Sequence, residues 1–168
     1  MKTADAILAA TLLAPMLALG GCHHRAVSQS TVTAAPPGIV VSQARLVLPP
    51  VKGNPGAAYF TVGNESSAPA RLVRVEIVGA QKTEMHQTSG GTMGPLPQVD
   101  IAPGQRVIFA PGGRHVMVFG LAPSLAIGGS SQIIFHFQDG KTTSTPLRID
   151  AAGDGMTGMA GMNMDGKP

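Results

Sequence analysis

The segment Ala57–Asn64 (AAYFTVGN) places Ala58, Phe60 and Val62 at alternate positions, and turn-forming residues follow it directly (GNESS, 63–67). Such alternation over four to eight residues is typical of a half-buried β-strand. Similar alternation recurs in Val73–Ile77 and Ile133–Phe137. Gly, Pro and Asn residues separate these short runs. We therefore expect seven or eight strands and no convincing helix between residues 39 and 150. This pattern of short strands separated by turns is typical of an all-β Greek-key sandwich or barrel, either cupredoxin-like or immunoglobulin-like.

A second pair of runs predicts one particular turn. Arg106–Ala110 and Arg114–Leu121 flank the sequence PGG at 111–113. Two β-type runs joined by so short a Gly-containing turn indicate a hairpin.

The composition supports this class of fold. Only 12% of the 168 residues are charged, and Gly (22) and Pro (14) together exceed a fifth of the chain. Few charges and many turn formers disfavour a helical bundle, whereas 43% hydrophobic residues suffice for a core. The net charge is +3, the basic residues are scattered, and there is no Trp. We therefore expect no nucleic-acid partner.

The amino terminus is typical of an export signal. Lys2 precedes the apolar run Ala6–Leu19, which is short for a membrane span and contains Pro15. The run ends in LGGC, which resembles the bacterial lipobox, so we predict a lipoprotein signal peptide over residues 1–21 and lipidation of Cys22. The protein would then be anchored to the inner or outer membrane on its periplasmic side. If cleavage occurs nearby and Cys22 stays unmodified, the protein would be soluble in the periplasm.

The rest of the chain divides by composition. Residues 22–38 are small and polar with two prolines, which indicates a flexible tether. Residues 39–150 carry the strand pattern and form the predicted domain. Residues 151–168 contain Gly, Met and Asp without a core pattern, which predicts a mobile Met/Gly-rich tail.

Four side chains form a candidate metal site: His86, Met93, His115 and Met117. His115 and Met117 are two residues apart, so on a strand they share one face. His86 and Met93 bracket a Gly-containing loop that could bring two more donors to the same point. Thioethers are soft, uncharged ligands that select Cu(I) over Zn²⁺, Mg²⁺ or Ca²⁺. Unlike cysteine, methionine is not lost to disulfide formation in an oxidising compartment.

Each of these residues also has a simpler explanation. Methionine commonly fills gaps in a core, and a histidine in a β protein is usually hydrogen-bonded rather than metal-bound. Alternation directs Met85 to the face opposite His86, which favours packing. It also directs His136 away from the flanking Phe135 and Phe137, and we do not expect it to bind metal.

Several segments resemble the periplasmic copper chaperone family called PCu(A)C, and the resemblance covers residues 39–150. They are AAYFTVGN (57–64), EMH (84–86), IAPG (101–104), PGGRHVMVFGL (111–121) and FQDGK (137–141). The family pattern is a His, ten residues, a Met, twenty-one residues, then His-x-Met. Here twenty-one residues separate Met93 from His115, but only six separate His86 from Met93. We interpret this departure as a shortened hairpin tip; the alternative is that Met85 replaces His86.

The resemblance implies a function. Such a protein would bind one Cu(I) through His86, Met93, His115 and Met117 at an exposed rim and would not be an enzyme. It would deliver the ion toward the binuclear copper site of cytochrome c oxidase subunit II, beside thiol-bearing copper assembly proteins. A blue-copper site needs a Cys ligand, and no cysteine follows Cys22. The alternatives are a structural or adhesion-like module without metal, and a copper redox enzyme.

Two further groups could bind copper. The tail contains four closely spaced methionines that could form a second, weaker collecting arm, although such a low-complexity end can also have no role. They are Met156, Met159, Met162 and Met164. His23 and His24, beside Cys22, could bind Cu(II), although acylation of Cys22 would remove the free amine used by many amino-terminal sites.

Overall fold

The computed structural model describes residues 37–153, which contain ten strands and no helix. The strands are β1 (Ile39–Val47), β2 (Gly56–Asn64), β3 (Ala70–Ile77), β4 (Lys82–Ser89), β5 (Thr92–Pro95), β6 (Val99–Ile101), β7 (Arg106–Phe109), β8 (Arg114–Phe119), β9 (Ser130–Phe137) and β10 (Thr142–Asp150). The predicted signal peptide, most of the tether, Cys22 and the tail methionines lie outside the described residues. No helix within 37–153 is long and apolar enough to cross a membrane.

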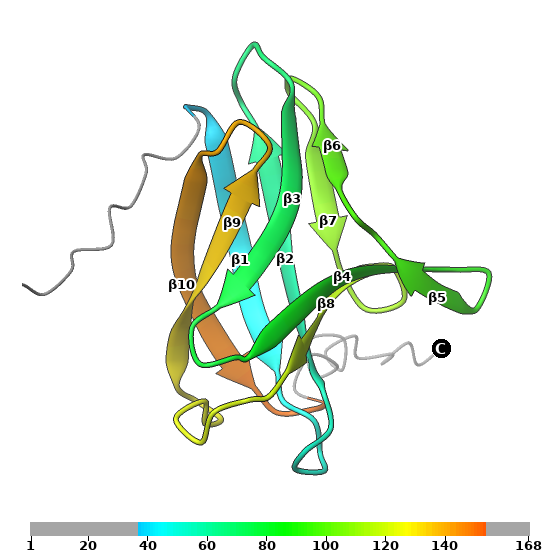
Figure 1. Cartoon of the computed structure of the whole chain (residues 1–168), viewed down its shortest axis with the longest axis vertical. Helices are drawn as coiled ribbons and strands as arrows, with labels where there is room; N and C mark the ends of the chain where they lie inside the picture. Colours follow the sequence, from blue (N-terminus) through cyan, green and yellow to red (C-terminus); the bar gives the residue numbers. More distant parts are fainter. Residues whose placement is uncertain (1–36, 154–168) are drawn as a thin grey trace, which may run out of the picture. The chain divides into compact units, whose positions relative to one another are not determined.

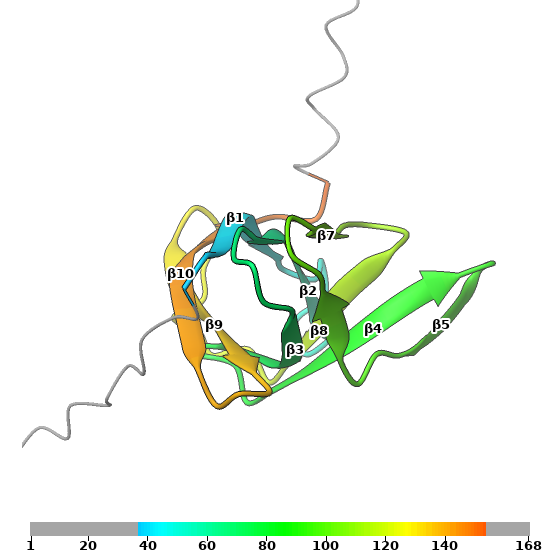
Figure 2. The same ribbon diagram turned by 90° about the horizontal axis from the view of Figure 1, so that it is seen from above.

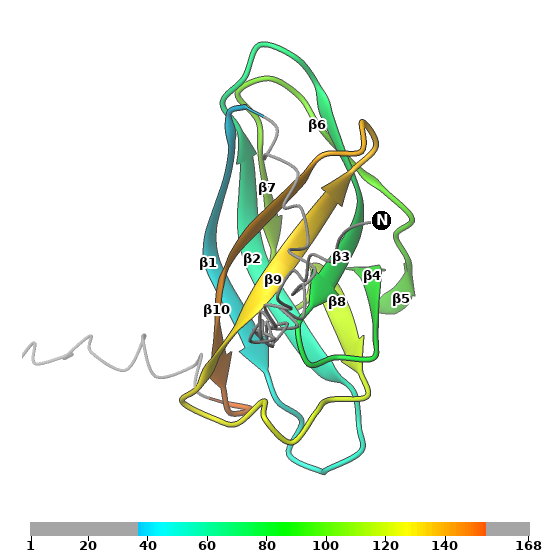
Figure 3. The ribbon, with the colours of Figure 1, turned by 60° about the vertical axis from the view of Figure 1, so that its left-hand side comes forward.

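The strands form one curled sheet in the order β5-β4-β8-β7-β2-β1-β10-β9-β3-β6, and β8 also pairs with β2 (Figure 1). Most pairs are antiparallel, but the first and last long strands, β1 and β10, run parallel (Figure 3). The predicted all-β class and the cupredoxin-like or immunoglobulin-like type are therefore confirmed. The strand number is higher than expected because β5 and β6, with four and three residues, are too short to stand out as alternating runs in the sequence.

The core fills the inside of the curled sheet. Phe60 of β2 stacks on Phe109 of β7, with ring centroids 4.3 Å apart, and meets Phe135 of β9 edge-on at 4.8 Å. All three rings are almost fully buried. In β2 and β9 the alternation in the sequence correctly identifies the inward face. In β3 it is correct for Val75 and Ile77 but wrong for Val73, which is 37% exposed, because the strand is irregular between Leu72 and Arg74 and buries Leu72 instead.

The predicted hairpin between residues 106 and 121 is wrong. β7 and β8 run parallel and pair only at Phe109 and Arg114. The PGG turn instead redirects the chain, so that β8 pairs antiparallel with β4 and with the start of β2. Gly112 has a positive φ of 78°, which an ordinary side chain rarely adopts. This crossing carries residues 115–117 alongside residues 84–86.

The end of β4 and all of β5 form an arm that extends away from the barrel (Figure 2). Ser89 pairs with Thr92 across a two-residue turn, Gly90-Gly91, in which both φ angles are positive (57° and 81°). Positive φ at both central residues is the signature of the turns that match the twist of a hairpin. The predicted shortened hairpin tip is therefore a two-residue turn, the commonest connection between the strands of a hairpin.

Candidate metal centre

Strand register brings the two candidate histidines together. β4 and β8 are antiparallel, and His86 lies directly opposite His115. Their ring centroids are 5.9 Å apart and the ring planes are tilted by 37°. On the reverse side of the same two strands, Met85 lies opposite Val116, and both are buried in the core. The histidines therefore occupy the outer face, since alternate residues of a strand point to opposite sides.

Met93 reaches this outer face from the arm. It lies opposite Thr88, which is two residues from His86 on the same side of β4. Its Sδ atom is 3.3 Å from Nε2 of His115. The residue is 51% exposed, which makes it one of the more exposed large apolar residues between 37 and 153. Core filling, the simpler explanation for a methionine, does not describe this one.

The backbone fixes the tautomer of His115. Nδ1 is 3.0 Å from the carbonyl oxygen of Gly113. Because a carbonyl only accepts, Nδ1 must carry the hydrogen and donate it. In the neutral ring the lone pair then resides on Nε2, the atom that faces Met93. A hydrogen bond from the second nitrogen commonly orients a metal-binding histidine in this way.

A carboxylate outside the predicted set of ligands lies beside His86. Its Nε2 is 3.5 Å from Oε2 of Glu84, two residues earlier on the same face of β4. Its Nδ1 is buried and has no hydrogen-bond partner in the structure. Glu84 also pairs with Lys82, with Nζ to Oε1 at 2.7 Å. The Lys82 ammonium holds the pKa of Glu84 below its ordinary value, and His86 adds to this effect.

Glu84 could have been found from its spacing. Glu84-x-His86 places an acid and an imidazole on one face of a strand, just as His115-x-Met117 does for the other pair. His115 and Met117 stood out because both are soft or borderline metal ligands, whereas the carboxylate of Glu84 is a hard oxygen ligand.

Met117 completes the set on the outer face. It is two residues from His115 on β8, and lies opposite Glu84 of β4 and Ala57 of β2. It is partly exposed. The structure thus places His86, His115 and Met117 on adjoining strands of one face, and Met93 over that face from the arm.

The donor separation suits one small ion. Two ligands of a tetrahedral site, a nitrogen at about 2.0 Å and a sulfur at about 2.3 Å from the metal, are about 3.5 Å apart. The 3.3 Å between His115 Nε2 and Met93 Sδ is close to that value. Both atoms present lone pairs to each other, an arrangement that a cation between them would stabilise. In residues 37–153, no three His, Cys, Asp or Glu side chains cluster to hold a metal.

The remaining candidates lie elsewhere. Met85 is 8% exposed and packs in the core, so it does not reach the outer face beside His115. His136 of β9 lies beside Arg74 and Glu76 of β3, with Nδ1 3.2 Å from Arg74 Nη2 and Nε2 3.1 Å from Glu76 Oε2. The structure thus places both where the simpler explanations expected them.

Solved structures with the same fold define the class of this domain. The copper-bound PCuAC domain from PmoF2 aligns with a TM-score of 0.60 at 20% identity, over 71% of this chain and 97% of that domain. The solution structure of Cu(I)-DR1885 from Deinococcus radiodurans aligns with a TM-score of 0.59 at 26% identity, over 76% and 88%. The domain therefore has the PCuAC fold, and the resemblance seen in the sequence is confirmed.

Within that class, the chain belongs to the LpqE-like family. The family model described as "Putative lipoprotein LpqE-like" matches residues 39–149. A relative from Leifsonia xyli subsp. xyli, "Putative lipoprotein Lxx21020", is 30% identical over 154 residues, which cover 88% of this chain and 92% of the relative.

Proposed function

We propose that this protein is an extracytoplasmic Cu(I) chaperone that holds one ion between His86, Met93, His115 and Met117. The observation that carries the proposal is the 3.3 Å approach of Met93 Sδ to His115 Nε2, with His86 directly opposite His115. The relative from D. radiodurans, solved as its Cu(I) form, supports the choice of metal and oxidation state. Two neutral imidazoles and two thioethers favour a soft monovalent ion.

The accessibility of Met93 favours carrying over catalysis, although His115 beneath it is buried. Met93 is half-exposed on a hairpin arm, so one ligand can be exchanged without unfolding the barrel. Four protein donors leave a Cu(I) ion no open position for a substrate. We infer that release occurs by stepwise ligand exchange, beginning at Met93.

The binding site is tested by competition for Cu(I) with a chromogenic chelator. The protein used carries leucine at all four tail methionines, so that the tail adds no thioether. We expect one tight equivalent of Cu(I), lost in His115→Ala and weakened in Met117→Ala. His136→Gln, a histidine on β9, which pairs with neither β4 nor β8, is the matched control and should keep wild-type affinity. Unchanged affinity in both site variants would refute the assignment.

Anchoring and delivery are the finer parts of the proposal. We infer that Cys22 is lipidated and holds the domain at the periplasmic side of a membrane, which the lipoprotein relatives support. Labelling with a radioactive fatty acid, abolished by Cys22→Ser, tests this.

We further infer delivery to the binuclear copper site of cytochrome c oxidase subunit II, with thiol-bearing assembly proteins taking part. Mixing the Cu(I)-loaded protein with apo subunit II and following the binuclear-site absorbance in the presence of those proteins tests delivery.

The tail methionines remain a proposed second, weaker site. Its test is the difference in copper stoichiometry between the wild-type protein and the variant with leucine at the four tail positions.

The alternative function, a structural module without metal, predicts no effect of Cu(I) on the unfolding temperature. A ligand that binds only the folded form must raise that temperature.

A further inference from the structure

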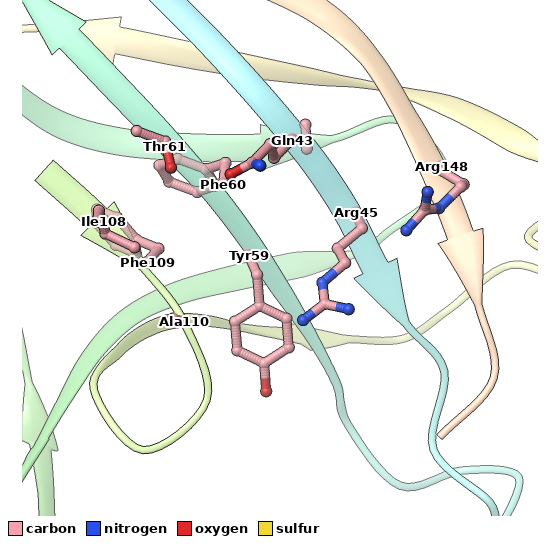
Figure 4. A pocket seen from close by; sticks show the side chains of 10 residues that line it. Gln43, Arg45, Tyr59, Phe60, Thr61, Ile108, Phe109, Ala110 and Arg148 are labelled. Carbon is pink, nitrogen blue, oxygen red and sulfur yellow. The ribbon is translucent and has the colours of Figure 1, made fainter. Parts of the chain in front are cut away.

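A second polar site lies on the outer face of β1, β2, β7 and β10, where a hollow of about 380 Å³ opens (Figure 4). Its polar lining comes from Gln43 and Arg45 of β1, Tyr59 and Thr61 of β2, and Arg148 of β10. Ile108 of β7, which is 60% exposed, forms an apolar wall. None of these residues is a candidate copper ligand.

The register places two arginines side by side. Arg45 pairs with Arg148 across the parallel β1–β10 ladder and with Tyr59 across the antiparallel β1–β2 ladder. Like charges directly opposite each other on neighbouring strands destabilise a sheet. This arrangement therefore costs stability unless negative charge lies nearby.

Only one of the two charges is neutralised by the protein. Arg148 forms two hydrogen bonds to Asp150, Nε to Oδ1 at 2.7 Å and Nη2 to Oδ2 at 2.9 Å. Arg45 has no carboxylate partner within residues 37–153. Its guanidinium instead lies over the Tyr59 ring, 5.3 Å from the ring centroid. The hollow thus has one uncompensated positive charge, on a side chain held by an aromatic ring.

A β-bulge creates this orientation of Arg45. Between the pairs Ser42–Thr61 and Arg45–Tyr59, β1 contains one residue more than β2. Before the bulge Ile39 and Val41 face the core, whereas after it Ala44 and Leu46 do. Without the extra residue, Arg45 would point inward. The bulge includes Gln43, which has a φ of 57° and is the only non-glycine residue with positive φ in the described part of the chain.

We propose that this hollow binds a carboxylate group, with Arg45 as its principal partner. Gln43 and Tyr59 line the hollow on either side of the Arg45 guanidinium (Figure 4). A guanidinium matches a carboxylate with two parallel hydrogen bonds. One negative charge balances the one uncompensated positive charge, whereas a phosphate dianion would exceed it. The exposed Ile108 suits a carboxylate with an apolar body. The group belongs either to a free small acid or to a Glu or Asp side chain of a partner protein.

The test uses sodium benzoate as the probe, with sodium chloride at equal ionic strength as the reference. We expect benzoate to raise the unfolding temperature of the purified protein and to shift the NMR signals of the Arg45 Nε–H and the Gln43 side-chain amide. Arg45→Gln should weaken benzoate binding at least tenfold. Lys52→Gln, which removes the same charge from the β1–β2 loop rather than from the lining of the hollow, should bind benzoate like the wild type.

Three outcomes would overturn the proposal: an equal effect of chloride, unchanged binding by Arg45→Gln, or phosphate binding tighter than benzoate with the same dependence on Arg45. If Arg45→Gln does not fold, unshifted Arg45 and Gln43 signals in the wild-type protein at saturating benzoate would overturn it. A peptide with a single Glu between leucines distinguishes the two sources. Tighter binding of the peptide assigns the site to a partner's side chain, and tighter binding of benzoate assigns it to a free acid. Neither binding experiment uses copper, so the result is independent of the proposed chaperone function.

Discussion

Met93 and His115 lie twenty-two positions apart in the chain, yet Sδ of one is 3.3 Å from Nε2 of the other. The two residues sit on strands that do not pair: β5 pairs with β4, and β4 pairs with β8. The contact therefore spans three strands and depends on the direction in which the β4–β5 arm leaves the barrel. It is a direct contact between two candidate copper ligands.

Met93→Leu tests the thioether at this contact. Leucine keeps a similar volume and apolar character but has no sulfur lone pair. Because Met93 is half-exposed, we expect the unfolding temperature of the copper-free protein to stay the same. We expect Cu(I) affinity to fall at least about tenfold, as losing a ligand should cost no less than losing an orienting contact. Chelator competition measures it; an affinity equal to wild type would show that Met93 is not a ligand.

The Gly113 carbonyl predicts a specific tautomer of His115. We expect ¹⁵N NMR of the copper-free protein at high pH to show Nδ1 protonated and Nε2 with the chemical shift of an unprotonated nitrogen. Cu(I) should move the Nε2 signal and leave Nδ1 protonated. His136, which has no such carbonyl contact among its described neighbours, is the internal reference. Protonation of His115 at Nε2 instead would contradict the proposed coordination.

Substitutions of the two glycines at the hairpin tip test how strongly Cu(I) binding depends on the β4–β5 arm. Gly90→Asn should be tolerated or mildly stabilising, because Asn-Gly is the preferred pair for this turn. Gly91→Val should distort the tip, since a β-branched residue rarely adopts a φ of 81°. We expect Gly91→Val to weaken Cu(I) binding while the unfolding temperature of the barrel changes little. Equal copper affinities in the two variants would show that the tip does not position Met93.

The bulge at Gln43 predicts an effect on stability. A non-glycine residue in the left-handed region costs about 1–2 kcal/mol. Glycine avoids this cost but loses more conformational entropy on folding, so the net gain in stability is smaller. We expect Gln43→Gly to stabilise the protein by up to about 1 kcal/mol in chemical denaturation. Gln43→Ala, which retains the strain, should give no gain. A loss of stability in the glycine variant would mean that the Gln43 side chain contributes more than its backbone costs.

Tyr59 offers a spectroscopic report on the second site. Burial raises the pKa of Tyr59, and the Arg45 charge partly opposes this shift. Since the chain has one Tyr and no Trp, absorbance near 295 nm follows Tyr59 alone. We expect Arg45→Gln to raise the pKa further. The folded form retains this proton to higher pH than the unfolded form, so stability falls as the pH rises above about 10. A lower pKa in Arg45→Gln would contradict the stacked arrangement.

Much of the candidate site follows from local rules. Alternation correctly placed Met85 in the core and His136 away from the phenylalanines, because side-chain direction along a strand depends only on parity. The spacing of His115 and Met117 put them on one face for the same reason. The hairpin at residues 106–121 was predicted wrongly, because a short Gly-containing turn fixes where the chain bends but not which strand it joins.

The class of fold, the inward residues of β2 and β9 and the residue types of a soft-metal site follow from the amino-acid sequence, because these depend on composition and on a period of two. The folded structure was needed to show that His86 faces His115, that Glu84 lies beside them, and that Arg45 meets Arg148. These neighbours come from strand pairing between distant segments and from one extra residue in β1. Pairing partners depend on the free energy of the whole sheet, and a single inserted residue reverses every side chain that follows it in the strand.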